Sequence, residues 1–476
     1  MVSAEPVTVA TLGFNVPCRQ FLLTANVTRD RRLPVVDEFV LRLLRLCEIL
    51  PANRMASYFG FTDSEMRVVL GELGERGLVV VDGDNVSLHS SAYAMFRGTD
   101  DGAPQVVEVD SWVDRIWFDL VSRNMIRPSR IRPLKYLVDI PASSSARDLP
   151  VSYARKAFEE NFASYLRDVK RIAAPDRFSL YSVSDAQPLR FGSVVLKADE
   201  ELVFDPNAKL RPTLLKEEIG EAAEHVALLG AMHDAYRKLS HPDPSLAARD
   251  DYRRLTLDKT VDASMDATGA FDLARWLSVR AREQKTRALI GATYLPKNID
   301  AIVGAVGEAL ALAPLAQGPN TLEITWYRPG GTIWGASPDL QDALARIRST
   351  IRVHNRAATV RSRLIIPQAV RHTKPGRFER VFDEAFVAPA GHISSGIEIL
   401  SVSGLVAAVL VTVPFSGEVG APVGLVVSGR SAVDRIEGVL QSINQGARAE
   451  KLWSKARGEQ LTGTEGPLVA PEIYDE

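Results

Sequence analysis

A run of 19 residues without a charged side chain, ILSVSGLVAAVLVTVPFSG from Ile399 to Gly417, limits the fold more than any other feature. The run is long enough to cross a membrane as a helix. It is rich in Val, however, Gly404 and Pro414 interrupt it, and a second apolar run, APVGLVVSG, follows. β-Branched residues and internal helix breakers favour strands over a helix. We therefore expect two strands buried on both faces of a sheet, and no membrane span.

Around this run, strand and helix patterns alternate from residue 271 to residue 446. We expect strands at RALIGATYL, TLEITWY and VRSRLIIP, before the two apolar strands. We expect helices over 271–286, 298–312, 339–348, 378–386 and 431–443. Such alternation predicts a mixed or parallel α/β sheet with helices on both faces.

Residues 34–91 have the clearest local pattern near the start of the chain. Pro34 precedes an apolar helix, a short helix follows over 52–59, and Thr62 or Asp63 can cap a third helix that ends near Arg76. The segments GLVVV, DGDN and VSLH then predict a β-hairpin. This order of helices and hairpin resembles the winged helix-turn-helix superfamily.

The winged-helix resemblance implies DNA reading, with the third helix in the major groove. The surfaces that would approach DNA are acidic, however. The third helix carries more acids than bases, and the hairpin tip adds two acids: Asp63, Glu65, Glu72, Glu75, Asp82 and Asp84, against Arg67 and Arg76. Phosphate neutralisation supplies most non-specific affinity for DNA. We expect a protein partner for this module, and a winged-helix transcription regulator remains an alternative.

The C-terminal α/β region has a second resemblance. Its first strand and helix, ALIGATYLPKNIDAIVGAVGEAL, and its end, GIEILSVSGLVAAVLVTVPFSG followed by EVGAPVGLVVSGRSAVDRIEGVLQSI, resemble one lobe of the phospholipase D-like phosphodiesterase and nuclease superfamily. The resemblance covers about residues 280–445. It implies a nucleophilic His, a Lys two residues later that binds phosphate, and an Asp five residues after the Lys. It also implies a later Gly-Ser-x-Asn turn and often a Glu.

This sequence lacks that catalytic pattern. Matching the family's Asp-Gly turn to Ser403-Gly404 puts Gly396 at the His and Glu398 at the Lys, where a carboxylate would repel phosphate. Only Glu418 matches, at the place of the family's late Glu. We therefore expect a lobe without catalytic residues.

Two histidines offer other alignments. Matching His392 to the family's His puts Ser394 at the Lys and Ile399 at the Asp. His372 and Lys374 form a His-x-Lys, but in a basic loop rather than on an apolar strand. A phosphodiesterase or nuclease that uses His392 or His372 remains an alternative.

A basic segment lies inside the same region. Between Ala345 and Arg380 there are ten Arg or Lys residues and one acid, in a chain whose net charge is −2. Because most of these residues are Arg, phosphate recognition is one interpretation. The other is that the aliphatic parts of the Arg side chains pack against the protein and their guanidinium groups form internal ion pairs. The expected nucleic-acid contacts are Arg352, Arg356, Arg361, Arg363, Arg371, Lys374 and Arg377.

Other site chemistry is not expected. Cys18 and Cys47 are too few for a zinc cluster and fit a reducing cytoplasm, and the first residues lack a secretory signal pattern. Glu221 and His225 share a helix face, but a metal site needs three or four ligands. No phosphate-cradling G-x-x-x-x-G-K-[ST] loop occurs. We expect no cofactor and no metal.

The sequence therefore predicts a multi-domain α/β and α+β protein. The expected parts are an N-terminal β segment (1–33), a winged helix (34–99), a mixed α+β region (100–270), a phospholipase D-like lobe (271–446) and an acidic tail (447–476). Within the first and third parts we expect short β pieces before residue 33, an amphipathic helix over 152–173, several strands over 178–204, a helix over 216–239 and an acid-rich loop over 250–269. The expected function is a non-catalytic nucleic-acid-engaging or scaffolding subunit in the bacterial cytoplasm. By analogy, such combinations suit multi-gene antiviral defence or mobile-element systems. Oligomeric state stays open.

Overall fold

The structure is a computed structural model of the 476-residue chain. It describes residues 6–96, 104–127, 133–144, 148–204, 208–214, 225–282, 287–312, 321–416, 419–445 and 450–455. The chain divides into two compact units, each built from separate stretches of sequence. Unit 1 is Met1–Pro17, Ser129–Pro141 and Ser193–Glu476; unit 2 is Cys18–Pro128 and Ala142–Gly192.

Unit 2 contains the helices and hairpin expected over 34–91, and all of them are confirmed. The helices are α1 (Val35–Cys47), α2 (Ala52–Phe59) and α3 (Asp63–Glu75), and a small sheet has the order β2 (Ile49–Pro51), β4 (Asn85–Leu88), β3 (Val79–Asp82). Thr62 caps α3 as predicted, because its hydroxyl accepts from Glu65 N and Glu65 accepts from Thr62 N. The apolar faces of the helices form one core.

A second sheet has the order β6-β5-β1-β8-β9, with β7 paired to β1. Its strands are β1 (Val7–Arg32), β5 (Gln105–Asp119), β6 (Met125–Ile126), β7 (Val138–Asp139), β8 (Phe178–Phe204) and β9 (Ala208–Leu214). The sequence predicted short pieces in place of β1 and several strands in place of β8, and both predictions were wrong. Each is one long strand that contributes residues to both units.

The amphipathic segment expected over 152–173 packs on the part of this sheet that belongs to unit 2. It is not one helix: α4 (Val151–Glu160) is followed by α5 (Phe162–Ser164) and a π-helical turn, Tyr165–Val169. Phe158 and Phe162 enter a core with Phe21 and Phe118.

Unit 1 is built on an eight-stranded sheet of order β10-β16-β15-β14-β11-β12-β13-β17. The strands are β10 (Arg287–Ile290), β11 (Thr321–Tyr327), β12 (Thr359–Pro367), β13 (Glu384–Ala388), β14 (Ile397–Val402), β15 (Val406–Ser416), β16 (Val419–Val427) and β17 (Glu450–Ser454). The two strands predicted in the uncharged run are β14 and β15, and this prediction is confirmed.

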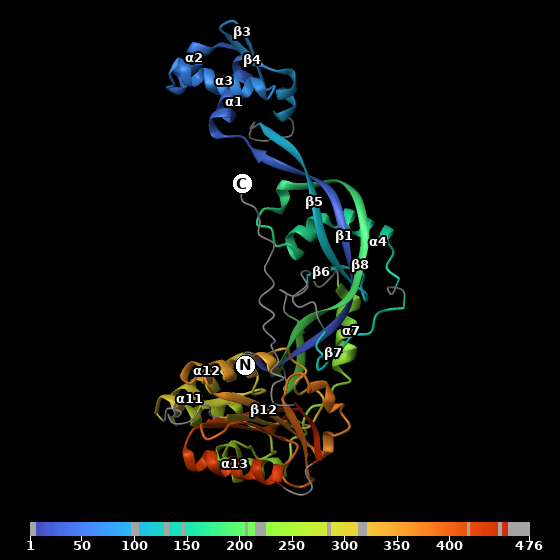
Figure 1. Ribbon diagram of the computed structural model, residues 1–476, viewed down its shortest axis with the longest axis vertical. Coiled ribbons are helices and arrows are strands. Elements are labelled where there is room, and N and C mark those ends of the chain that lie inside the picture. Colours follow the sequence, from blue (N-terminus) through green and yellow to red (C-terminus); the bar gives the residue numbers. More distant parts are fainter. Residues whose placement is uncertain are drawn as a thin grey trace. The chain divides into compact units, whose positions relative to one another are not determined.

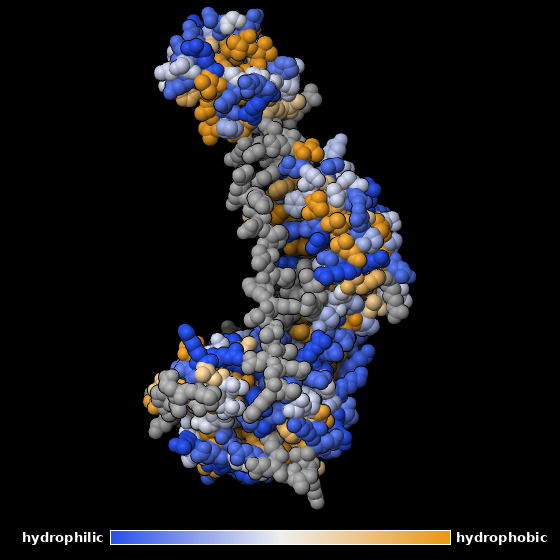
Figure 2. Space-filling model, viewed as in Figure 1, coloured by the Kyte–Doolittle hydropathy of each residue, from blue (hydrophilic) through white to orange (hydrophobic). Residues whose placement is uncertain are grey.

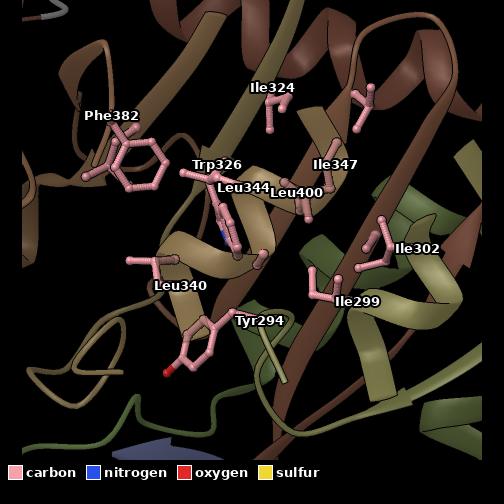
Figure 3. Close-up of a cluster of buried hydrophobic side chains, with 14 of the residues drawn as sticks. Tyr294, Ile299, Ile302, Ile324, Trp326, Leu340, Leu344, Ile347, Phe382 and Leu400 are labelled. Carbon is pink, nitrogen blue, oxygen red and sulfur yellow. The ribbon is translucent and has the colours of Figure 1, made fainter. Parts of the chain in front are cut away.

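Helices cover both faces of this sheet (Figure 1). On one face lie α11 (Pro296–Leu312) and α12 (Asp339–His354); on the other lie α8 (Leu246–Thr256), α10 (Leu273–Arg282) and α13 (Arg430–Gln445). Alternate residues of β14 point to opposite cores: Leu400 packs with the first group, Ile399 with the second. Burial on both faces explains why the run carries no charge. Figure 3 shows the first core around Trp326.

Two further predictions of secondary structure were wrong. The acid-rich stretch 250–269 was expected as loop, but α8 extends into it and α9 (Thr260–Ala263) follows. The helix expected over 378–386 is a 3₁₀ turn, Pro375–Phe378, followed by β13. The helix expected near 216–239 is described as α7 (Val226–Tyr236). Residues 215–224 and 456–476, which include most of the expected acidic tail, lie outside the described residues.

Within the described ranges, no helix is long and apolar enough to cross a membrane.

Candidate functional site

The carboxyl ends of five strands lie at one edge of the eight-stranded sheet. β11, β12 and β13 are mutually parallel, and the antiparallel series through β14, β15 and β16 gives β15 and β10 the same direction. In open α/β sheets this edge is where ligands bind.

A cavity of about 40 Å³ lies at this edge. Its polar lining comes from Glu200, His241, Tyr294, Glu398 and Thr412, and the remaining lining is largely apolar. The volume suits about three water molecules, whereas ligand sites typically measure about 300–1,000 Å³. The cavity is therefore too small for a nucleotide.

Glu398, the second residue of β14, lines the cavity at this edge. Its Oε1 accepts hydrogen bonds from the Trp326 indole at 2.9 Å, from the Trp334 indole at 2.8 Å and from the Thr293 hydroxyl. The side chain is fully buried, and burial raises the pKa of the carboxyl group, although the bonds from Thr293 and the two indoles oppose the shift. An indole N–H can only donate, and both indoles donate to Glu398. These bonds hold the Glu398 side chain in place.

The segment between α7 and α8 packs against the start of β14. A Cβ atom at Gly396 would lie 2.8 Å from Ala248 Cβ and 3.1 Å from the Asp243 carbonyl oxygen. Thr332 N donates to the Ser240 carbonyl at 2.9 Å, which fixes this segment to the loop after β11. No space is left beside Gly396 for a larger side chain.

His241 and Glu200 form an ion pair at the cavity wall. His241 Nε2 lies 2.6 Å from Glu200 Oε1, and the Tyr236 hydroxyl donates to the same oxygen at 2.7 Å. Burial alone would lower the pKa of His241, but the bond to Glu200 and its charge outweigh it, and the pKa is raised. Sequence analysis did not single out either residue. No local motif marks them, because they lie 41 positions apart and meet only through the fold.

The seven predicted nucleic-acid contacts have different environments. Arg352, Arg356, Arg371 and Lys374 are exposed, and Arg361 is half-buried. Arg371 pairs with Glu450 at 2.6 Å. Arg363 pairs with both Glu323 and Glu384, at 2.8 Å and 2.6 Å. Arg377 donates to the carbonyls of Thr332 and Trp334.

The exposed members form two groups rather than one surface. Arg352 and Arg356 precede β12, whereas Arg371 and Lys374 follow it. The nine residues of β12 separate the two ends by about 26 Å, at about 3.3 Å per residue.

Neither histidine of the alternative alignments lines the cavity. His392 is exposed, and its carbonyl oxygen accepts from Arg254. His372 is exposed on the loop after β12. Among the described residues, no group of three or more potential ligands could hold a metal ion. Glu221 lies outside the described residues.

No family profile and no curated protein matches this sequence. Two solved structures share a distant likeness with it. Nuc, a phospholipase D family member from Salmonella typhimurium, gives a TM-score of 0.22 at 11% identity, over 36% of this chain and 99% of Nuc. TrmBL2, an archaeal chromatin protein described with a novel mode of DNA binding, gives 0.20 at 9% identity, over 88% and 95%. These scores are too low to assign a fold or a function.

Proposed function

We propose that this chain is a non-catalytic, nucleic-acid-engaging or scaffolding subunit of a bacterial multi-protein system, and that unit 1 holds a degenerate phospholipase D-like lobe. The observation that carries the proposal is Glu398. In the alignment set by Ser403-Gly404, it stands where the family places its phosphate-binding Lys. Ionised or neutral, a carboxyl group held by two indoles and a threonine supplies no positive charge to a phosphate.

The turn between β14 and β15 supports that alignment. Gly404 has a φ of 70°, a conformation that favours glycine, as the Asp-Gly turn of the family would. The alignment puts Gly396 at the nucleophile, where Ala248 and the Asp243 carbonyl leave no room for an imidazole. Nucleophile and phosphate-binding cation would both be missing.

The helices and hairpin of residues 35–88 have the element order of a winged helix, and we propose that they bind protein rather than DNA. All six acids of the third helix and the hairpin tip are exposed. Tyr58 on α2 and Val68 on α3 are also exposed, at 71% and 61%. Figure 2 shows apolar residues among hydrophilic ones on the visible face of this part. Exposed aromatic and aliphatic side chains suit a protein partner.

Nucleic acid would contact the two exposed basic groups beside β12. Fluorescence anisotropy with single- and double-stranded DNA and RNA, across a salt series, tests this. Two double variants separate the groups: Arg352→Gln with Arg356→Gln, and Arg371→Gln with Lys374→Gln. A matched control, Arg253→Gln with Arg254→Gln, removes two exposed charges from α8.

Each lost phosphate contact should flatten the log–log salt dependence by roughly 0.7–0.9. The control should keep the slope of the unmodified protein. Absence of binding to every nucleic acid at low salt would remove the nucleic-acid part of the proposal and leave the scaffolding part.

A phosphodiesterase is the second candidate, because the cavity wall holds a histidine paired with a buried acid. His241 and Glu200 have the chemistry of a general base and its orienting carboxylate. The small cavity volume argues against it. Turnover of bis(p-nitrophenyl) phosphate by the full chain, abolished by His241→Gln, would favour this candidate over the first.

A further inference from the structure

Arg328 follows β11 directly and is fully buried. Its guanidinium carbon lies 5.3 Å from the centre of the Trp334 ring and 5.7 Å from that of Phe378. Nε donates to the Pro329 carbonyl at 3.2 Å, and Nη2 donates to the Gly331 carbonyl. The third nitrogen, Nη1, is buried without a hydrogen-bond partner.

Arg377 approaches the same place from the loop after β12. Its guanidinium carbon lies 4.7 Å from the Phe378 ring centre, and its Nη2 donates to the Thr332 and Trp334 carbonyls at 3.1 Å and 3.4 Å. Its Nε is buried without a partner. Two arginines therefore bracket one short loop, each with an unused donor.

The two charges are uncompensated. Burial lowers the pKa of Arg328 to about 9, with the charge of Arg377 as the next cause, and burial lowers the pKa of Arg377 to about 10. Both groups remain cationic near pH 7. Within the described residues, no Asp or Glu pairs with either, whereas Arg363 and Arg348 pair with acids nearby. Buried like charges without a counter-charge are costly.

The position of the pair favours a ligand. Arg328 and Arg377 come from segments that follow the parallel strands β11 and β12, at the edge of the sheet where ligands bind in α/β folds. Arg377 is partly exposed, whereas Arg328 is fully buried behind it in the chain's interior. Its loop also carries Arg371 and Lys374, whose exposed charges attract anions.

We propose that Arg328 and Arg377 form a binding site for a phosphate-type oxyanion. Tetrahedral oxyanions accept hydrogen bonds from several directions, which matches two guanidinium groups with spare N–H donors. The phosphate comes from a small molecule or from the phosphorylated end of a nucleic-acid strand. The inference does not rest on the proposed function, because free phosphate alone tests it.

The test is thermal unfolding of the full chain in phosphate and in chloride at equal ionic strength. Saturating phosphate should raise the melting temperature by at least about 2 °C relative to chloride, since a ligand of the folded state stabilises it. Arg377→Gln should abolish the increase, measured against its own chloride baseline. Arg380→Gln is the matched control, because Arg380 is an exposed charge three residues away, and it should keep the increase.

Oligonucleotides with and without a 5′-phosphate distinguish the sources. A saturable response to inorganic phosphate or pyrophosphate identifies a small-molecule ligand. A response confined to the 5′-phosphorylated strand, lost in Arg377→Gln, identifies a strand end. The proposal is overturned if neither probe acts beyond chloride, or if Arg377→Gln responds as the unmodified protein does. Arg328→Gln is a supplementary variant, and the test stands on Arg377→Gln if Arg328→Gln does not fold.

Discussion

Arg363 and Glu323 form a two-pronged ion pair between the neighbouring parallel strands β12 and β11, with Nη1 and Nη2 at 2.8 Å and 2.9 Å from the two carboxylate oxygens. The same guanidinium also contacts Glu384 on β13. One side chain thus ties three adjacent strands together. Part of the basic segment therefore serves the sheet, and a high local net charge overstates the charge available to a partner.

Arg363→Gln should lower stability. The substitution removes the cation that both Glu323 and Glu384 contact, and removing one partner of a partly buried pair costs about 1–3 kcal/mol. Chemical denaturation should show this loss, while Arg352→Gln, at an exposed position on α12, should leave the midpoint within error. Equal midpoints for both variants would count against a structural role of Arg363.

The stability of the Glu398→Gln variant, relative to that of the unmodified protein, should increase as pH rises. The pKa of Glu398 is raised above 4.5 in the folded state, so its contribution is fully present below pH 4.5 and is lost as pH rises through the folded value. Glutamine keeps an acceptor for the indoles and carries no charge. Melting temperatures between pH 4 and pH 8 test the trend.

Glu398→Leu should behave differently. It leaves the indole N–H groups of Trp326 and Trp334 buried without an acceptor, at about 1–3 kcal/mol for each. Its melting temperature should fall at every pH. A leucine variant as stable as the glutamine variant would show that the hydrogen bonds contribute little.

Replacing acids of the third helix and hairpin tip should not weaken nucleic-acid binding. Glu72→Ala with Asp82→Ala and Asp84→Ala removes three exposed negative charges and should leave affinity unchanged or raise it. Glu65 is left intact, because it completes the capping box of α3 and its loss would also destabilise the helix. A drop in anisotropy-measured affinity would place nucleic acid on this module.

His241→Gln should cost most stability at low pH. The pKa of His241 is raised above 6.5 in the folded state, so its contribution is fully present below pH 6.5 and is lost as pH rises through the folded value. Denaturation midpoints at pH 6 and pH 9 should differ more from the unmodified protein at pH 6. His372→Gln, at an exposed site, should show no such difference.

Local patterns were sufficient for much of the secondary structure. The residues around Thr62 identified a helix start because capping is decided within four positions. The uncharged run identified β14 and β15 because burial on both faces removes charges from a strand. The acid-rich stretch 250–269 was wrongly predicted as loop. Its first acids, Asp250 and Asp251, instead form ion pairs with Arg253 and Arg254 one turn away on α8, and such pairs stabilise a helix.

Only part of the candidate site could be predicted from the sequence. Sequence alignment marked Gly396 and Glu398, but the donors that hold Glu398 come from 105, 72 and 64 positions away. Arg328 was missed, although a charged residue directly after the apolar strand TLEITWY is a signal that a search for buried charges would have used.

The division of the chain has a consequence for its synthesis. Unit 2 ends at Gly192, so all its residues have been synthesised before the last stretch of unit 1 is begun. The first 17 residues of the chain, by contrast, belong to unit 1, and several of their partners are encoded more than 170 codons later. Val9, whose carbonyl receives the backbone N–H of Ala292, is an example. We therefore expect folding in the cell to begin with unit 2, within residues 18–192, and to finish when the first residues of the chain join the C-terminal stretch of unit 1.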